Sequence, residues 1–266
     1  MPLASHRTPT LLVADIEAVK DKHVLADWPD DKWPPPVGWH VVAIGMLLAK
    51  LTQTGEGLTV HVEKSGCITG PEDQIIRRFW TLFDKHEPLL VTWNGRGYDL
   101  PVLVQRAFIN AVSTPRWFQA GNRYESYRHR YSDNWHCDLM DRLSEYGACA
   151  KTSMGLFAKA MGLPGKIGGD GAQVEAMFEA GEIEKIAAYC ECDVLNLYGI
   201  YLRWLMVTGQ MGGAEYDASE NQLAEFLRVK NKAHHATFLA NWGRRRQHSP
   251  FCAPLISTSI LGRMCV

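Results

Sequence analysis

The first residues along this sequence whose types and spacing could support catalysis are two carboxylates, Asp15 and Glu17. Asp15 and Glu17 end the apolar segment 11–17, and the alternation of a β-strand would point both side chains to the same side. Like charges at this spacing repel each other, so we expect bound cations to relieve the pair. An acidic pair at a strand end can also be simply solvated, and three residues alone do not decide between these interpretations.

A third carboxylate, Asp99, follows a short apolar strand and the glycine-containing turn from Asn94 to Tyr98. Aspartate is a favoured helix N-cap and asparagine with glycine is common turn chemistry, which is the structural interpretation. In α/β sheets, however, ligands bind at the carboxyl ends of strands. Because Asp99 and Glu17 each follow such an end, we expect them to face one pocket.

The fourth carboxylate, Asp193, lies four residues after Tyr189 in a long helical segment, so the two side chains share one helix face. Apolar residues 186, 197 and 201 flank that face. An acid on a core-facing stripe is costly unless it is paired or binds a metal. Glu191 lies off this stripe and is expected to be solvated.

Four carboxylates and a phenol form a set of hard oxygen donors, which favour magnesium or manganese over zinc. No histidine or cysteine in the sequence stands beside them at ligand spacing. Two such ions, about 3.5 to 4 Å apart, would activate a water and stabilise the leaving oxygen of a phosphoryl displacement. The residues therefore predict metal-dependent hydrolysis of a phosphodiester.

The elements that must position these residues follow from hydrophobic periodicity. Strands are expected at 11–17, 39–51, 58–64, 88–93 and 136–139, with Gly55 and Gly57 in the first hairpin turn. Helices are expected at 71–86, from 99 onward, and at 138–147, 153–161, 172–180, 183–207 and 218–242. Three antiparallel strands, then strands alternating with helices, predict an α/β fold with a mixed sheet flanked by helices. The proline-studded segment 20–38 is expected to form a surface loop near the acidic rim.

Composition bounds the class of protein. The 266 residues are 46% hydrophobic and 21% charged, which excludes a disordered chain, a collagen-like chain and a disulfide miniprotein. The net charge of −1 means that any nucleic-acid surface must be local. No apolar stretch reaches the roughly 20 residues that span a bilayer, and the first residues lack a secretory h-region. Seven cysteines without a CxxC pair predict reduced thiols and a cytoplasmic location.

The motifs resemble those of the DEDD 3'-5' exonucleases, which have a ribonuclease H-like fold, in the variant that carries tyrosine (DEDDy). Asp15-Ile16-Glu17 looks like the first motif, Asn94 through Tyr98-Asp99 like the second, and Tyr189 to Asp193 like the third. The likeness is strongest to stand-alone predicted exonucleases related to the proofreading domain of family B DNA polymerases, and it covers residues 8–207.

The resemblance implies a metal-dependent enzyme that hydrolyses phosphodiester bonds at the 3' end of single-stranded nucleic acid, with DNA favoured, and releases nucleoside 5'-monophosphates. It implies that two divalent cations, magnesium or manganese, are held by Asp15, Glu17, Asp99 and Asp193. Tyr189 would orient the attacking water, because a phenol with a pKa near 10 is a poor base at neutral pH. The implied partners are single-stranded 3' ends and a replication or repair protein, with proofreading in trans and no membrane.

Substrate contacts are less sharply indicated. Asn94 would brace its turn or contact the substrate, and Tyr98 would lie beside it. Lys166, among glycines, could approach a phosphate or be a solvated loop lysine. Ala18 stands where the polymerase motif usually has threonine, so a side-chain contact near the 3' end is expected to be missing.

Three segments remain open between structural and functional roles. Residues 123–131 interleave basic and aromatic side chains, as single-strand binding surfaces do, but an amphipathic surface loop has the same composition. Arg244 to Arg246 could touch nucleic acid or complement a helix C-terminus. His136 and Asp138 could border the site, although Asp138 is expected to cap the next helix.

The expected organisation is an exonuclease domain at 8–213 followed by a helical C-terminal extension at 214–266. Two alternatives stay open for function. One is an RNA-trimming or oligoribonuclease-like exonuclease, because nothing in the sequence indicates recognition of a 2' hydroxyl. The other is a catalytically idle nucleic-acid-binding scaffold, which the intact set of four carboxylates disfavours.

Overall fold

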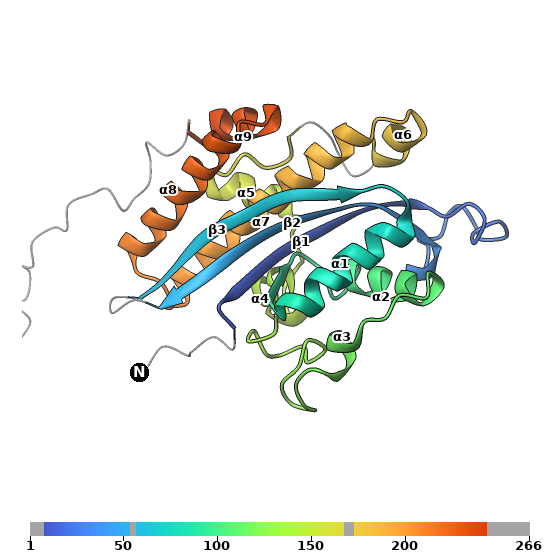
Figure 1. Cartoon of the computed structure of the whole chain (residues 1–266), viewed down its shortest axis with the longest axis horizontal. Helices are drawn as coiled ribbons and strands as arrows, with labels where there is room; N and C mark the ends of the chain where they lie inside the picture. Colours follow the sequence, from blue (N-terminus) through green and yellow to red (C-terminus); the bar gives the residue numbers. More distant parts are fainter. Residues whose placement is uncertain (1–7, 54–56, 168–172, 244–266) are drawn as a thin grey trace, which may run out of the picture.

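The computed structural model describes residues 8–53, 57–167 and 173–243. Its centre is a five-stranded sheet with the order β3-β2-β1-β4-β5. Figure 1 shows the three long strands β3, β2 and β1 side by side. The strands are β1 (Thr10–Lys20), β2 (Trp39–Gln53), β3 (Leu58–Thr69), β4 (Leu89–Thr92) and β5 (His136–Asp138). Strands β1, β2 and β3 pair antiparallel, whereas β4 and β5 run parallel to β1. The predicted mixed α/β sheet is confirmed.

Strand β1 runs further than its sequence pattern predicts. It pairs with β2 as far as Lys20, but with β4 only from Leu11 to Val13. Asp15 and Glu17 therefore lie inside the strand, beyond the point where its β4 neighbour stops, and not at the strand's own end. A register shift between Glu17 and Ala18 marks a β-bulge, a feature that often re-aims side chains beside functional sites.

Helices cover both faces of the sheet (Figure 1). Helices α7 (Ile183–Val207) and α8 (Gly213–Lys230) lie on one face, and α1 (Glu72–His86) and α2 (Asp99–Ile109) on the other. Alternation along β1 sends Leu11 and Val13 into the α7 core, and Leu12, Ala14 and Ile16 into the α1 core. The same alternation points Asp15 and Glu17 toward α7.

The smaller helices connect these layers. They are α3 (Pro115–Gln119), α4 (Leu139–Leu143), α5 (Met154–Met161), α6 (Val174–Glu179) and α9 (Ala233–Gly243), with 3-10 turns at Pro36–Gly38 and Glu145–Gly147. Ser153 caps α5 and Asp138 caps α4, each accepting a hydrogen bond from a backbone amide of the first turn. The capping role predicted for Asp138 is therefore confirmed.

Two predicted helices are shorter than expected. The segment 138–147 leaves the α-helix after Leu143, because Glu145 and Tyr146 take left-handed backbone angles. The single helix predicted at 218–242 is two helices, α8 and α9, separated where Asn231 adopts φ 49°. Asparagine tolerates this conformation better than most residues, so it ends α8. Within the described ranges, no helix has both the length and the apolar character needed to cross a membrane. Gly55 of the predicted hairpin turn lies outside those ranges.

Candidate active site

Helix α7 approaches the sheet closely at Asp15. Gly45 of β2 pairs with Asp15 in the register, and its amide donates a hydrogen bond to Sγ of Cys190 over 3.0 Å. A Cβ atom at Gly45 would lie 2.7 Å from the carbonyl oxygen of Cys190. Glycine at this position therefore lets α7 lie directly over the acidic part of β1.

This close approach brings the first and third motifs together. Donor atoms of Asp15, Glu17 and Cys190 all lie within 4.8 Å of one another. Tyr189 and Asp193 lie on α7 just before and shortly after Cys190, and both are buried. The Cys190 sulfur contacts the Gly45 amide and the carbonyl oxygen of Asp15, so its contacts are those of a packing residue.

The second motif reaches the same place from the free edge of β1. Asp99 is the first residue of α2, and its Oδ1 accepts a hydrogen bond from the Ile16 amide over 3.2 Å. This amide lies between Asp15 and Glu17, and it is free to bond because β4 ends before it. The N-cap position belongs to Tyr98 and has no side-chain cap. The carboxylate of Asp99 therefore does not cap α2 but bonds the backbone of β1.

Asp138 holds the turn that carries the second motif. Its two carboxylate oxygens accept hydrogen bonds from the amides of Asn94 and Arg96, each over 2.9 Å. Asn94 adopts a left-handed φ of 59°. Arg96 in turn donates to the carbonyl oxygens of Tyr127, His129 and His136. Asp138 therefore positions the turn as well as capping α4, a role that its sequence context did not indicate.

Burial and neighbouring carboxylates oppose the ionisation of Asp15, Glu17 and Asp99. Burial and the charges of Asp99, Glu17 and Asp193 raise the pKa of Asp15 well above its ordinary range. Burial and the charges of Asp193 and Asp99 raise that of Glu17, against a lowering effect of Lys166. Burial, with the charge of Asp138, raises the pKa of Asp99 to about 7. Such a set of oxygens is poised to bind cations, because a bound cation removes the repulsion.

The phenol of Tyr189 is a hydrogen-bond donor here. Burial, the charges of Asp193 and Glu17, and a hydrogen bond to Asp193 all raise its pKa. Since the phenol stays protonated at neutral pH, it can orient a water or a phosphate oxygen but cannot act as a general base. The water-orienting role that the resemblance implies for Tyr189 stays a prediction.

The three predicted substrate contacts lie around this cluster. The ring of Tyr98 packs edge-on against Trp39, with 5.6 Å between centroids. Lys166 is close enough for its charge to lower the pKa of Glu17. Its loop is held by Asn196 of α7, whose side chain bonds both the amide and the carbonyl oxygen of Gly165, over 2.9 and 2.8 Å. Whether Asn94, Tyr98 and Lys166 contact substrate stays a prediction.

The expectation that Glu191 is solvated is wrong. Glu191 is buried, and its carboxylate binds Lys232, His234 and His235 from the start of α9, together with Ser65 of β3. The face of α7 that seemed free is thus covered by the C-terminal helices. A helical wheel of α7 alone could not reveal this, because the covering residues follow 41 to 44 positions later.

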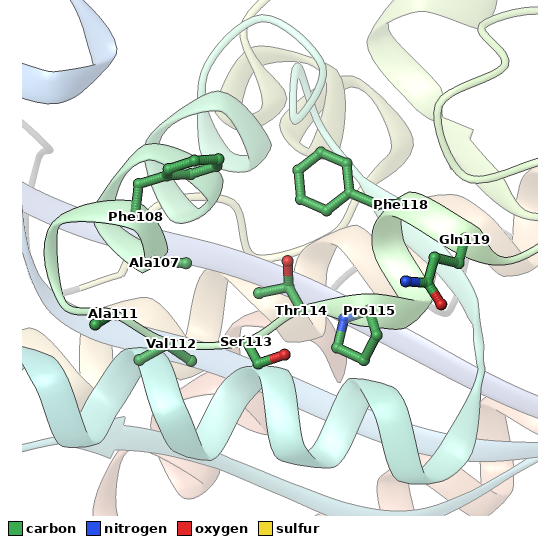
Figure 2. Close-up of a pocket in the computed structure, with 9 residues that line it drawn as sticks. All are labelled: Ala107, Phe108, Ala111, Val112, Ser113, Thr114, Pro115, Phe118 and Gln119. Atoms are coloured by element: carbon green, nitrogen blue, oxygen red, sulfur yellow. The ribbon is translucent and has the colours of Figure 1, made fainter.

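The segment 123–131, singled out in the sequence, combines buried and surface side chains. In 123–131, Tyr127 is wholly buried, while Arg123 lies over the Tyr124 ring and Arg128 over the Phe118 ring. Figure 2 shows the residues that line a pocket, among them Phe108 and Phe118. The volume of this pocket is about 500 Å³. Phe108 is nine residues along α2 from Asp99, hence roughly 14 Å away at 1.5 Å per residue. Arg244 to Arg246, and the glycines at 168, 169 and 171, lie outside the described residues.

Residues 33–242 match the family described as "Predicted 3'-5' exonuclease related to the exonuclease domain of PolB". The chain belongs to this family. No curated protein matches the chain significantly.

Solved structures place this PolB-related exonuclease among known folds. The family B DNA polymerase from the hyperthermophilic archaeon Pyrobaculum calidifontis aligns with a TM-score of 0.51 and 16% identity, covering 79% of this chain and 26% of the polymerase. A structure of exonuclease I aligns with a TM-score of 0.37 and 13% identity, covering 87% of this chain and 46% of that one. The chain thus spans less than half the length of either. With the sheet order, the polymerase alignment confirms the ribonuclease H-like fold.

Proposed function

We propose that this protein is a metal-dependent exonuclease that removes nucleoside 5'-monophosphates from the 3' end of single-stranded nucleic acid, with DNA as the favoured substrate. The observation that carries the proposal is the meeting of four carboxylates and Tyr189, from three separate segments, at the free edge of β1. Family membership supports the direction of cleavage.

In this proposal, Asp15, Glu17, Asp99 and Asp193 hold two divalent cations, magnesium or manganese. The donor set fits them, because it offers hard oxygens whose pKa values are raised by burial and, at Asp15 and Glu17, also by the neighbouring carboxylates of the set. Cations bound there would supply water activation and stabilisation of the leaving oxygen. Tyr189, kept protonated, orients the water. Asn94 and Tyr98 contact the last nucleotides, and Lys166 contacts a phosphate.

The domain organisation is proposed as an exonuclease domain at 8–213 with a C-terminal extension at 214–266. In the described part, α8 packs against β3 and α9 against α7. We place the protein in the cytoplasm, a proposal that the free state of its five described cysteines supports. A replication or repair protein is the proposed partner.

Two measurements test the proposed reaction. Digestion of single-stranded DNA with magnesium, followed by chromatography of the products, should yield nucleoside 5'-monophosphates, and 3'-monophosphates would contradict the proposal. Digestion of RNA of the same sequence under the same conditions should be slower. Faster cleavage of RNA would favour the RNA-trimming alternative. Absence of products on both, with intact binding, would favour the idle scaffold.

A further inference from the structure

An exposed tryptophan stands next to the candidate active site. The side chain of Trp33 is 73% exposed. Its ring lies 4.9 Å from that of Trp39 and 6.3 Å from that of Tyr98, measured between centroids. Trp39 is buried and closes the set from behind. An apolar side chain of this size, open to water on one side and packed on aromatic rings on the other, offers a ready stacking surface.

The loop that carries Trp33 is held in shape by its own contacts. The Asp21 amide bonds the carbonyl oxygen of Gly38 over 2.8 Å and closes the loop at its base. The Trp39 indole bonds the carbonyl oxygen of Pro34 over 3.3 Å, and two further prolines follow Pro34. Proline fixes φ, so the segment beside Trp33 has few conformations to choose from. A ring presented this way loses little conformational entropy when it binds a ligand.

The base of this loop is anchored by a buried ion-pair network. Arg106 of α2 bonds Asp21 over 3.0 Å and the carbonyl oxygen of Val37 over 3.3 Å. The same guanidinium pairs with Glu72, the first residue of α1. The loop is therefore attached to the helix that begins with Asp99. Trp33 and Asp99 thus belong to one connected unit.

Tyr98 links the tryptophan to the carboxylates. It directly precedes Asp99, whose carboxylate accepts a hydrogen bond from the Ile16 amide, between Asp15 and Glu17. Tyr98 is thus joined through Asp99 to the carboxylates, and its ring lies 6.3 Å from that of Trp33. A strand whose terminal phosphodiester sat at the carboxylates would place its last bases within reach of these rings.

We propose that Trp33, supported by Trp39 and Tyr98, stacks on a nucleobase within the last two nucleotides of the 3' end. The inference rests on the proposed function, because it takes the carboxylate cluster as the place where the strand ends. Nucleobases are the ligands that this surface fits, since every base has a π-face and stacking needs no particular sequence. Trp33 then holds the end of the strand without selecting among bases.

The experiment compares the full-length wild type with Trp33→Ala, Trp33→Phe and Phe108→Ala. Phe108 is the control, because it is a 76% exposed aromatic side chain at the far end of α2 from Asp99. Each variant is measured on a single-stranded DNA and on the same strand lacking the bases of its last two nucleotides. Steady-state cleavage gives kcat and KM, and fluorescence anisotropy of the labelled strands gives Kd. Circular dichroism melting verifies that each variant is folded.

Stacking on one base changes affinity by about 1–3 kcal/mol on alanine substitution, which is about 5- to 150-fold. Trp33→Ala should therefore raise KM and Kd for the complete strand by such a factor, Trp33→Phe should restore most of the loss, and Phe108→Ala should stay within twofold. Removing the two bases should weaken wild type to a similar degree and weaken Trp33→Ala no further. Additive losses from the variant and the missing bases would overturn the proposal.

The failure of this inference differs from the failure of the proposed function. A wild type that cleaves, with Trp33→Ala equal to it on both strands, overturns the stacking alone. If the wild type cleaves neither strand, the proposed function fails, and the Kd values still test the stacking. A Kd of Trp33→Ala equal to that of wild type then overturns the stacking, and it is the result expected if this surface binds a protein partner instead.

Discussion

The backbone amide of Ile16 donates a hydrogen bond of 3.2 Å to the carboxylate of Asp99, 83 residues further along the chain. This bond joins the strand that carries Asp15 and Glu17 to the helix that begins the second motif. It exists because β4 stops pairing with β1 at Val13 and leaves the Ile16 amide without a β4 partner. The early end of a neighbouring strand thus creates the place where the acidic residues meet.

Replacing Asp99 by asparagine should abolish cleavage and make the metal-free protein less sensitive to pH. The pKa of Asp99 is about 7 in the folded protein against an ordinary 3.8, so the folded state holds this proton more tightly. The resulting stabilisation is complete below about pH 4 and is lost as the pH rises through 7. Asparagine still offers an oxygen to the Ile16 amide.

The measurement is thermal melting in chelator between pH 5 and 8. The Tm of wild type should fall by several degrees more than that of Asp99→Asn, since 1 kcal/mol corresponds to about 2–4 °C in a chain of this size. Parallel pH profiles for the two proteins would contradict the raised pKa of Asp99.

Divalent cations should stabilise the wild type and not a ligand variant. At a hundredfold excess over Kd, a bound ion adds about 2.7 kcal/mol to the free energy of unfolding, or roughly 5–10 °C in Tm. Glu17→Gln should lose most of this increase, whereas the control Glu63→Gln, at an exposed position of β3, should keep it. Equal increases in both variants would place the cations elsewhere.

Gly45→Ala should disturb the site by pushing α7 away from the sheet. The added methyl would meet the Cys190 carbonyl oxygen at 2.7 Å and Val194 Cγ2 at 2.8 Å, and overpacking of this kind costs about 1–3 kcal/mol. Gly66→Ala on the neighbouring strand is the control, since nothing lies within 4 Å of its Cβ position. The free energy of unfolding in denaturant and kcat should both fall for Gly45→Ala and stay unchanged for Gly66→Ala. An unchanged kcat in a destabilised Gly45→Ala would show that the close approach serves packing only.

Glu191→Ala should destabilise the protein strongly. Although burial opposes it, hydrogen bonds from His234, His235 and Lys232 hold the pKa of Glu191 well below its usual range. The stability from this carboxylate is present above about pH 4.5, its unfolded value, and is lost as the pH falls. Removing one partner of a buried ionic cluster costs about 3–5 kcal/mol.

The control is Glu225→Ala, which removes an exposed ion pair with Arg228 and should cost at most about 1 kcal/mol. Urea unfolding at pH 7 compares the two variants. Similar free energies of unfolding would mean that the α9 cluster contributes no more than a surface pair.

Much of this fold follows from periodicity and cap chemistry in the sequence. The helix predicted at 183–207 has those bounds in the structure, and α1 begins directly after the proline that was expected to start it. The mixed sheet followed from the order of strands and helices. These features are local, so the pattern within one segment decides them.

Features that depend on the neighbour of an element could not be predicted in the same way. The sequence around Glu17 predicted a strand end, because the continued pairing of β1 with β2 is invisible in β1 itself. Glu191 seemed solvated because α9 covers it only after the chain has turned back at Asn231. Asp138 was expected to cap a helix, and its hold on the Asn94 turn depends on the pairing of β4 with β5.

The candidate site followed from residue types at motif spacing, but its support did not. Gly45 had no signal in the sequence beyond being a glycine in a strand, and Asn196 looked like an ordinary helix residue. Both act through contacts with residues more than 30 positions away. The four carboxylates and Tyr189 lie together as the motifs suggested, and their chemistry stays a prediction.

A time course on 5'-labelled single-stranded DNA tests the central claim most directly. Wild type, Asp193→Ala and Tyr189→Phe are incubated with magnesium, manganese or chelator, and the products are resolved by length. The account predicts a ladder that shortens from the 3' end with either metal, no products in chelator or from Asp193→Ala, and slow cleavage by Tyr189→Phe. Cleavage by Asp193→Ala at the wild-type rate, or a ladder that persists in chelator, would contradict it.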